Sequence, residues 1–176
     1  SGNGNNFAVY SSSVDSYDVK LDSPTNNFCT INSIREYTVY NGSVTLSEGN
    51  LQSVDAGTTY SLHWTGTFGM STGKWYWEVL AHTMGGSSAN IGICNELHRV
   101  STAGTGVFYG NDGKRNAVTY YTGTTTYGDS YTSGDIIGIA FDADNETVTF
   151  YKNNSSQGAV GSVLTTANGP YFAAAG

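Results

Sequence analysis

From residue 42 onward the sequence consists of short apolar-polar alternations that are interrupted every few residues by Gly, Asn or Asp. Alternation with a period of two places successive side chains on opposite faces of a strand, and Gly, Asn and Asp favour turns. Runs of about four to eight residues separated by such turns are typical of β-sandwiches. The chain is also poor in the Glu, Lys, Leu and Ala that helices favour. The sequence therefore predicts an all-β fold built as an antiparallel sandwich.

One run, GKWYWEV at residues 73 to 79, places two of the three tryptophans of the chain around a tyrosine. In an extended strand Trp75 and Trp77 point to one face of the sheet. Tyr76 and Glu78 point to the other face. On this pattern alone the strand is either the buried wall of a sandwich or an exposed aromatic platform that binds a ligand.

The clearest hairpin joins an apolar run at residues 136 to 141 to a second strand across a polar turn at residues 142 to 146. The first run is apolar at nearly every position, which predicts a central strand with both faces covered. Its Gly138 is expected to admit a bulky neighbour, such as a tryptophan, close to the main chain. In the second strand, Val148 and Phe150 are expected to share one face.

The chain before the regular pattern has a different character. Residues 1 to 6 read as a flexible Gly/Asn leader, and residues 7 to 40 hold short alternations that are broken at Pro24. We therefore predict an N-terminal arm or edge segment at residues 1 to 41 and one sandwich domain at residues 42 to 176.

Charge and hydropathy exclude two classes of partner. The formal net charge is −7 with a pI near 4.6, and only seven Lys and Arg are present, scattered along the chain. A basic groove for a nucleic-acid backbone is therefore not expected. No stretch approaches the roughly 20 apolar residues of a membrane span, so no membrane insertion is expected.

Metal and disulfide patterns are weak. His63, His82 and His98 are too irregularly spaced to match a recognised ligand pattern. Cys29 and Cys94 could form one bridge, but we favour two buried free thiols, because small disulfide scaffolds usually carry four or more cysteines and free Cys is commonly buried. We predict neither a metal nor a cofactor.

Catalytic patterns are weak as well. The turn DADNE begins like a calcium loop but lacks the required Gly and closing Glu. No G-x-S-x-G motif is present to activate a serine. Glu78 could pair with Asp135 or Asp142 as glycosidase carboxylates only if the fold brought them together. No catalytic residue is predicted.

Five ordered segments resemble a SPRY domain, the bent β-sandwich that is also found within B30.2 modules. They are GKWYWEV (73 to 79), NIGIC (90 to 94), VFYGNDGKR (107 to 115), the run from YGDSYTSGD to NNSSQG (127 to 158) and GPYFAA (169 to 174). The resemblance implies a sandwich of two antiparallel sheets, similar to jelly-roll and concanavalin folds, that binds partners without catalysis. It also implies that Trp75, Tyr76 and Trp77 are mostly scaffold.

The resemblance has two departures. Asn154 stands where the family commonly has Gly in the turn after a lysine. The closing strand of the family, with its aromatic-Asn-Phe-Gly pattern, is missing from the sequence. We expect that the chain is an excised piece, or that a partner or the N-terminal arm supplies this strand, because an open edge invites aggregation.

A second resemblance concerns the setting of the domain. The segment LDSPTNNFCTIN (21 to 32) and the Ser/Thr/Tyr/Gly-rich texture are similar to SPRY-containing proteins of bacteriophages, especially tail and other virion proteins. This implies a virion or extracellular location in a phage, and a soluble protein otherwise.

The predicted binding residues lie in loops, because a rigid sandwich commonly carries its binding residues on connections between strands. Tyrosine gives rigid, amphipathic contact area, and Asn and Ser give adaptable hydrogen bonds. The candidate loops span residues 58 to 64, 95 to 104 and 114 to 127. The candidate ligand contacts in them are Tyr60, His63, Trp64, His98, Arg99, Arg115, Tyr120, Tyr121 and Tyr127.

We therefore expect a non-catalytic binding module of a phage virion or tail protein that recognises a host surface glycan or protein. The first alternative is a structural decoration or assembly module that packs against neighbouring virion subunits. The second is a eukaryotic-type, peptide-binding SPRY adaptor. Oligomerisation through the parent protein is compatible with each of these interpretations.

Overall fold

The structure is a computed structural model, which describes residues 28–34, 44–55, 64–84, 89–96, 106–117, 125–161 and 164–176. Strands dominate these residues, apart from a short 3-10 helix at Thr166–Asn168. The predicted all-β class is confirmed. Among the described residues, no helix is long and apolar enough to cross a membrane.

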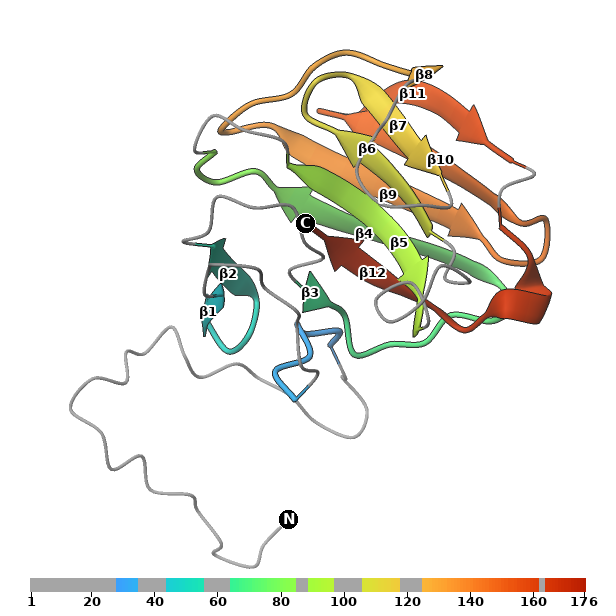
Figure 1. The fold of residues 1–176 in the computed structure, drawn as a ribbon, viewed down its shortest axis with the longest axis horizontal. Coiled ribbons are helices and arrows are strands. Elements are labelled where there is room, and N and C mark those ends of the chain that lie inside the picture. Colours follow the sequence, from blue (N-terminus) through green and yellow to red (C-terminus); the bar gives the residue numbers. More distant parts are fainter. Residues whose placement is uncertain are drawn as a thin grey trace, which may run out of the picture.

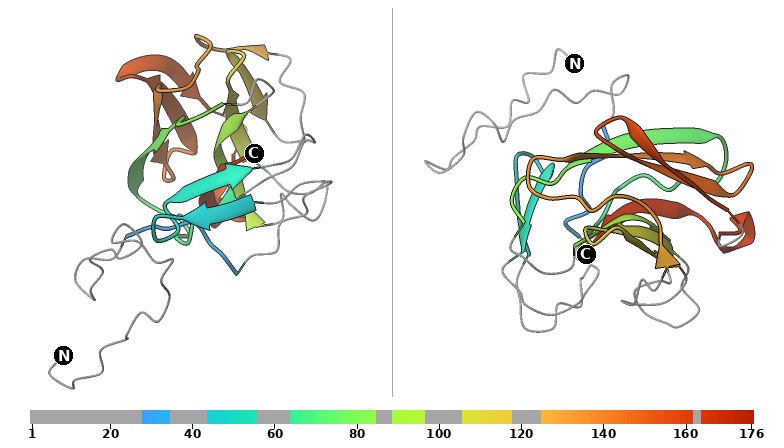
Figure 2. Two further views of the ribbon diagram at one scale, coloured as in Figure 1. Left: turned by 90° about the vertical axis from the view of Figure 1, so that its left-hand side faces the viewer. Right: turned by 90° about the horizontal axis from the view of Figure 1, so that it is seen from above.

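Two antiparallel sheets form the body of the molecule, and Figure 2 shows them as two layers. The four-stranded sheet has the order β11-β10-β9-β4, and the six-stranded sheet has the order β3-β12-β5-β6-β7-β8 (Figure 1). The strands of the first sheet are β4 (Lys74–Leu80), β9 (Ile136–Asp142), β10 (Thr147–Lys152) and β11 (Ser155–Val160). The strands of the second are β3 (Trp64–Thr65), β5 (Asn90–Asn95), β6 (Gly106–Gly110), β7 (Lys114–Ala117), β8 (Thr125–Thr126) and β12 (Tyr171–Ala175).

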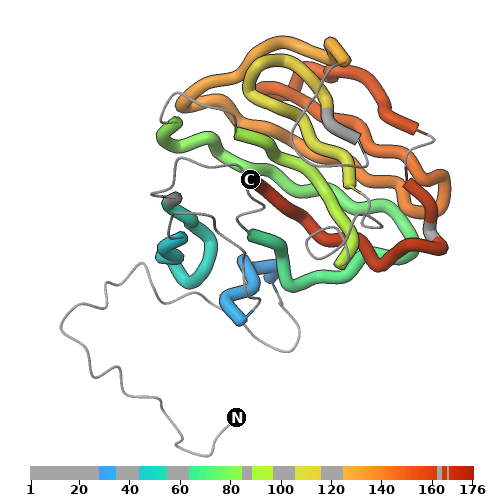
Figure 3. The backbone as a smooth tube through the Cα atoms, in the orientation of Figure 1, coloured from blue at the N-terminus to red at the C-terminus, as the bar shows by residue number. Residues whose placement is uncertain are grey.

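A small hairpin lies beside the two sheets. It is formed by β1 (Val44–Ser47) and β2 (Gln52–Asp55), and Figure 3 shows it in teal, apart from the sandwich. Residues 28–34 connect this hairpin to the sandwich. The amide of Ile31 donates to the carbonyl of Asn50 at 2.8 Å, and Ile31 bridges Gly66, next to β3.

The core lies between the two sheets and is filled by residues at alternate strand positions. The fully buried side chains include Ile137, Ile139, Val148 and Phe150 from the four-stranded sheet, and Ile93, Val107, Tyr109 and Tyr171 from the six-stranded sheet. Each buried side chain of this size contributes about 1.5 to 3 kcal/mol relative to an exposed one. Val148 and Phe150 share the inward face, as the alternation predicts.

The predicted hairpin is also confirmed, because β9 and β10 pair across a turn at residues 143 to 146. β9 lies between β10 and β4, so the strand that is apolar at nearly every position is an interior one, as predicted. The expectation that both of its faces are covered is wrong at its start, because Ile136 on the outer face is 41% exposed. Asp142 fastens the turn by accepting from the amide of Asn145 at 3.0 Å and from its side chain at 2.9 Å. These bonds, with the Lys74 ammonium 3.3 Å away, lower the pKa of Asp142.

Gly138 admits a bulky neighbour, as expected, but that neighbour is a tyrosine rather than a tryptophan. A Cβ atom at Gly138 would stand 2.6 Å from the hydroxyl oxygen of Tyr76. The register explains the choice, because Glu78 is the residue of β4 opposite Gly138 and Tyr76 is its neighbour on the same face.

The GKWYWEV strand is only partly a buried wall. Trp77 and Val79 pack against the core, whereas Trp75 is 36% exposed and donates its indole N–H to the carbonyl of Thr72 at 2.7 Å. Tyr76 lies on the outer face and is 55% exposed. The scaffold expectation therefore holds best for Trp77.

Two smaller expectations are also resolved. Both cysteines are free thiols, as expected, but only Cys94 is buried, and the expectation of a buried Cys29 is wrong because its side chain is exposed. Asn153 and Asn154, in the turn between β10 and β11, both have positive φ, at 47° and 67°. Asn is the residue other than Gly that best tolerates this conformation, which explains why the turn forms without the Gly common in the family.

Candidate binding surface

Two of the predicted loops leave the sandwich at the same end. β5 ends at Asn95, β6 begins at Gly106 and β7 ends at Ala117. The register pairs Cys94 with Gly106 and Val107 with Ala117, so these three strand ends are neighbours. We call this place the Asn95 end. His98, Arg99, Tyr120 and Tyr121 belong to the connections that start here, but these residues lie outside the described residues.

The base of the Asn95 end is fixed by buried hydrogen bonds. The Asn95 side chain is buried and donates from Nδ2 to the carbonyl of Asn168 at 3.0 Å. The hydroxyl of Tyr171, the residue opposite Asn95, donates to the carbonyl of Thr165 at 2.9 Å. Buried polar groups with satisfied partners hold a single geometry, so both loops start from a rigid base.

Trp64 belongs to the opposite end of the sandwich. It pairs with Ala175, whereas Asn95 pairs with Tyr171, so Trp64 and Asn95 lie beside opposite ends of β12. Its side chain is half-buried. Tyr60 and His63 precede it in the sequence and lie outside the described residues. The structure therefore does not bring Trp64 together with the Asn95 end.

Arg115 and Tyr127 lie close to one another in the last strands of the six-stranded sheet. Arg115 pairs with Tyr109 and Thr125, two residues before Tyr127. The Tyr127 ring is half-buried against Tyr109 and Phe150, with centroid separations of 5.4 and 5.9 Å. Its hydroxyl donates to the carbonyl of Gly158. Tyr127 thus already has structural partners, and its role in ligand binding stays a prediction.

Electrostatics around Tyr127 support this placement. Burial is the main cause that raises the pKa of Tyr127. The amide of Phe150, which donates to its hydroxyl at 3.4 Å, and the positive charge of Arg115 act in the opposite direction. A neutral, packed phenol is the form that the fold favours.

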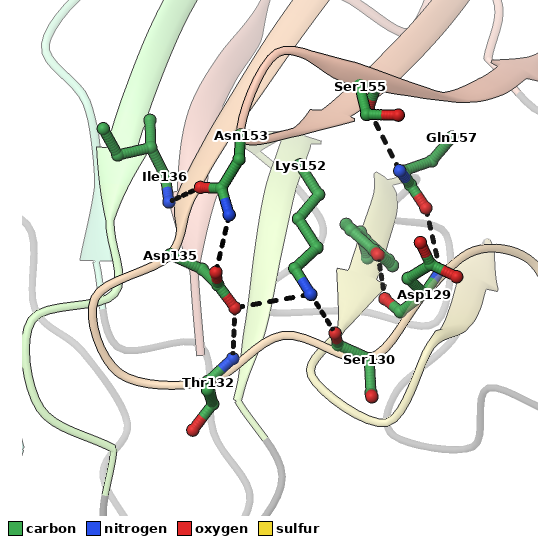
Figure 4. Close-up of polar contacts among 10 residues, drawn as sticks. Asp129, Ser130, Thr132, Asp135, Ile136, Lys152, Asn153, Ser155 and Gln157 are labelled. Carbon is green, nitrogen blue, oxygen red and sulfur yellow. Dashed lines mark hydrogen bonds and ion pairs between the residues drawn. The ribbon is translucent and has the colours of Figure 1, made fainter.

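The loop between β8 and β9 is fastened by Asp135, as Figure 4 shows. One carboxylate oxygen accepts from the amide of Thr132 at 2.8 Å and lies 3.5 Å from the Lys152 ammonium. The other accepts from the side chain of Asn153 at 2.7 Å. Lys152 also donates to the carbonyl of Ser130 at 2.7 Å. Sequence reasoning considered Asp135 only as a carboxylate for glycoside hydrolysis and missed this structural network.

Two of the carboxylates considered for glycoside hydrolysis, Asp135 and Asp142, have lowered pKa values. The Thr132 amide, and then the Asn153 side chain, lower the pKa of Asp135. A glycosidase general acid instead needs a raised pKa. Glu78 accepts from the hydroxyl of Tyr76 at 2.8 Å. Among the described residues, no group of three or more His, Cys, Asp and Glu gathers in a way that could hold a metal.

A second surface lies on the outer face of the four-stranded sheet. Tyr76, Leu80 and Ile136 are 55%, 53% and 41% exposed, and Leu80 stands opposite Ile136. Tyr151, opposite Gly138, meets the Tyr76 ring edge-on with centroids 6.5 Å apart. We call these four residues the outer aromatic patch. The alternation in GKWYWEV placed Tyr76 on this face, but the other members come from strand pairing that local patterns do not reveal.

Comparison with known proteins agrees with this geometry. Residues 74–176, more than half of the sequence, match the SPRY domain family. The chain belongs to the SPRY domain family. SPRY domains are in general non-catalytic modules that bind protein partners.

One relative is the ATP-dependent RNA helicase DDX1 of Xenopus laevis. The two sequences are 26% identical over 136 residues, which cover 68% of this chain and 18% of the helicase. The chain thus spans less than a fifth of the length of this relative. This similarity is consistent with the domain family and does not indicate a phage setting.

Proposed function

We propose that this SPRY domain recognises a protein partner through the two connections at the Asn95 end. The observation that carries the proposal is the shared origin of these connections on adjacent strands, over a base that Asn95 and Asn168 fix. His98, Arg99, Tyr120 and Tyr121 are the contacts that the proposal assigns. Aromatic and Arg side chains on a rigid scaffold are typical of binding hot spots.

The proposal includes a setting, in which the partner is exposed on the surface of a bacterial host and the domain belongs to a phage virion. The support for this setting is the Ser/Thr/Tyr/Gly-rich sequence texture and the low content of basic residues. A host glycan is the alternative ligand, because aromatic and amide-rich loops also suit sugars. Packing against neighbouring virion subunits is the alternative role.

The test is binding of the fluorescently labelled domain to a panel of bacterial cells. Tyr120→Ala/Tyr121→Ala alters the Asn95 end, and Tyr60→Ala/His63→Ala is the matched control next to Trp64, at the opposite end. The proposal predicts saturable binding that the first variant loses by at least about tenfold, the scale of one hot-spot residue, and that the control retains.

Treatment of the cells separates the two ligand classes. Protease treatment should abolish binding if the partner is a protein, whereas periodate oxidation should abolish it if the ligand is a glycan. Loss of binding in the control variant alone would move the site to the Trp64 end. If the folded domain binds none of the cells, the host-recognition proposal is wrong and the assembly role is favoured.

A further inference from the structure

The strand β4 forms one edge of the four-stranded sheet, and Figure 1 shows it in green below β9. An unpaired strand edge presents free N–H and C=O groups, which are a template for pairing with another strand. Among the described residues, β4 pairs with β9 alone. The side of β4 that faces away from β9 is therefore open within the described part of the chain.

The hydrogen bonds at the two ends of β4 identify which residues face this open side. The carbonyl of Gly73 accepts from the amide of Ala143 at 2.9 Å, and the amide of Ala81 donates to the carbonyl of Asp135 at 2.9 Å. In an antiparallel ladder such bonded positions recur at every second residue. Trp77, between these ends, therefore bonds to β9, and Tyr76 and Glu78 direct their main-chain groups to the open side.

The side chains along the β4 edge are complementary in charge to those of a second, antiparallel copy of β4. Lys74 and Glu78 flank Tyr76 at equal distance in sequence and carry opposite charges. Consider two copies of β4 that run antiparallel, with Tyr76 opposite Tyr76 of the second copy. Lys74 of each copy then stands opposite Glu78 of the other, and Trp75 opposite Trp77. Opposite charges and aromatic pairs at directly opposed positions stabilise such a ladder.

We propose that two copies of this chain form a dimer by antiparallel pairing of their β4 edges in this register. The sheets of the two copies then join into one continuous sheet across a two-fold axis that passes between the Tyr76 residues. A two-fold interface uses the same surface on both copies, so the assembly closes at the dimer.

The exposure and charge of the side chains along the β4 edge are compatible with pairing to a second copy of the chain. The Lys74 side chain is 78% exposed and 3.3 Å from Asp142, so it is free to turn toward a second carboxylate. Glu78 is exposed, and among the described residues its side chain is hydrogen-bonded to Tyr76 of the same strand. The edge is flanked by the outer aromatic patch, so pairing places the two patches on one face of the joined sheet.

The tryptophans of this strand offer a spectroscopic readout of pairing. Trp75 is 36% exposed, and in the proposed register it stands opposite Trp77 of the second copy. Its fluorescence emission should therefore respond to pairing.

The first test is the solution mass of the purified chain, measured by sedimentation equilibrium from ~1 µM to ~1 mM, the range of weak specific association. The proposal predicts a rise from the monomer mass of 18.6 kDa to twice that value, with a parallel shift in tryptophan emission. A monomer over the whole range overturns the proposal. Species that grow beyond the dimer also overturn it, because a two-fold pair closes.

The second test isolates the register by charge reversal. Lys74→Glu and Glu78→Lys each place like charges opposite one another, and each should weaken the dimer roughly tenfold. An equimolar mixture of the two variants regains opposite charges at both positions and should form a mixed dimer, detected by native mass spectrometry. Lys114→Glu in β7 is the control for the charge change and should leave dimerisation unaltered.

The third test concerns the main chain. Tyr76→Pro removes the N–H at the centre of the proposed ladder but no bond to β9, since that N–H faces the open side. Tyr76→Thr removes the same ring and retains the N–H. The proposal predicts that only the proline variant is monomeric, with circular dichroism confirming that both are folded. Equal dimerisation of the two variants would show that β4 is not the contact.

Discussion

At the scale of single residues, two glycines in strand interiors have different neighbours. A Cβ atom at Gly92 would overlap the carbonyl oxygen of Val107 and stand 2.8 Å from the Cα of Phe108, both main-chain atoms of β6. At Gly138 the nearest atoms all belong to the exposed side chain of Tyr76, which can turn away if it gives up its hydrogen bond to Glu78. The sequence marks both positions as glycine but does not tell which of them touches main chain, since that depends on the pairing of distant strands.

This difference predicts opposite outcomes for the same substitution. Gly92→Ala should lower the free energy of unfolding by at least about 3 kcal/mol or prevent folding, because the sheet cannot yield at a main-chain contact. Gly138→Ala should change it by less than about 1 kcal/mol, because only Tyr76 needs to turn. Urea unfolding followed by tryptophan fluorescence measures both values, and equal losses would contradict the assignment of neighbours.

Another residue-scale prediction concerns alkaline pH. Burial is the main cause that raises the pKa of Tyr109 from 10.0 to about 12. The folded protein therefore holds this proton more tightly than the unfolded chain does. The resulting stability is complete below pH 10.0 and is lost as the pH rises from 10.0 toward about 12. The unfolding free energy should fall over this window.

The matched variant for this prediction is Tyr109→Phe, which lacks the titrating hydroxyl. At neutral pH it should be less stable by about 1 kcal/mol, because the hydroxyl donates to the carbonyl of Asp129. Across the alkaline window its unfolding free energy should decline less than that of the natural protein. Urea unfolding at a series of pH values tests this, and parallel declines would show that Tyr109 does not cause the effect.

At the scale of elements, the hairpin of β9 and β10 follows from the sequence, but its attachment to the preceding loop does not. The apolar run and the polar turn are local patterns, and both strands form where these patterns lie. The contacts of Asp135 with Asn153 and Lys152 span 17 or more residues, so no local pattern reveals them. Many residues in the sequence could pair with the Asp135 carboxylate, and only the folded structure shows which of them lie within hydrogen-bond distance.

We predict that Asp135→Ala loosens the loop at residues 129 to 135 without unfolding the sandwich. Amide hydrogen exchange of Thr132, which donates to Asp135, should become faster, and exchange within β9 and β10 should change little. Asp129→Ala is the control. It removes a carboxylate from the same loop, but the Asp129 side chain accepts no hydrogen bond from an amide among the described residues. Unaltered exchange in the Asp135 variant would show that the network does not hold the loop.

The hydrogen bonds of Asp135 should also weaken when this carboxylate is protonated at low pH. Its hydrogen bonds lower the pKa of Asp135 below 3.8, so the contribution of this group is present above pH 3.8 and is lost as the pH falls through the lower folded value. The rate of amide hydrogen exchange in the loop at residues 129 to 135, corrected for its intrinsic pH dependence, should therefore rise only in strong acid.

At the scale of the whole molecule, sequence reasoning predicted the fold class and family but not the arrangement of the loops. Strand periodicity and ordered motifs suffice for the class, because they are repeated along the chain. The candidate loops were treated as one group, whereas the pairing of β12 with β3 and β5 puts Trp64 at the opposite end from Asn95. The open edge of β4 and the outer aromatic patch also depend on sheet order, which local patterns do not contain.

The position of β12 has a consequence for synthesis of the chain. This strand comprises Tyr171–Ala175, yet it lies between β3 and β5, which are made much earlier. On the ribosome, β3 and β5 cannot share a sheet until residue 175 has left the exit tunnel. Sheets closed by contacts so distant in sequence form slowly, and their unpaired strands are exposed meanwhile. The domain therefore completes its sandwich only after translation of this strand, and nascent chains need protection from aggregation until then.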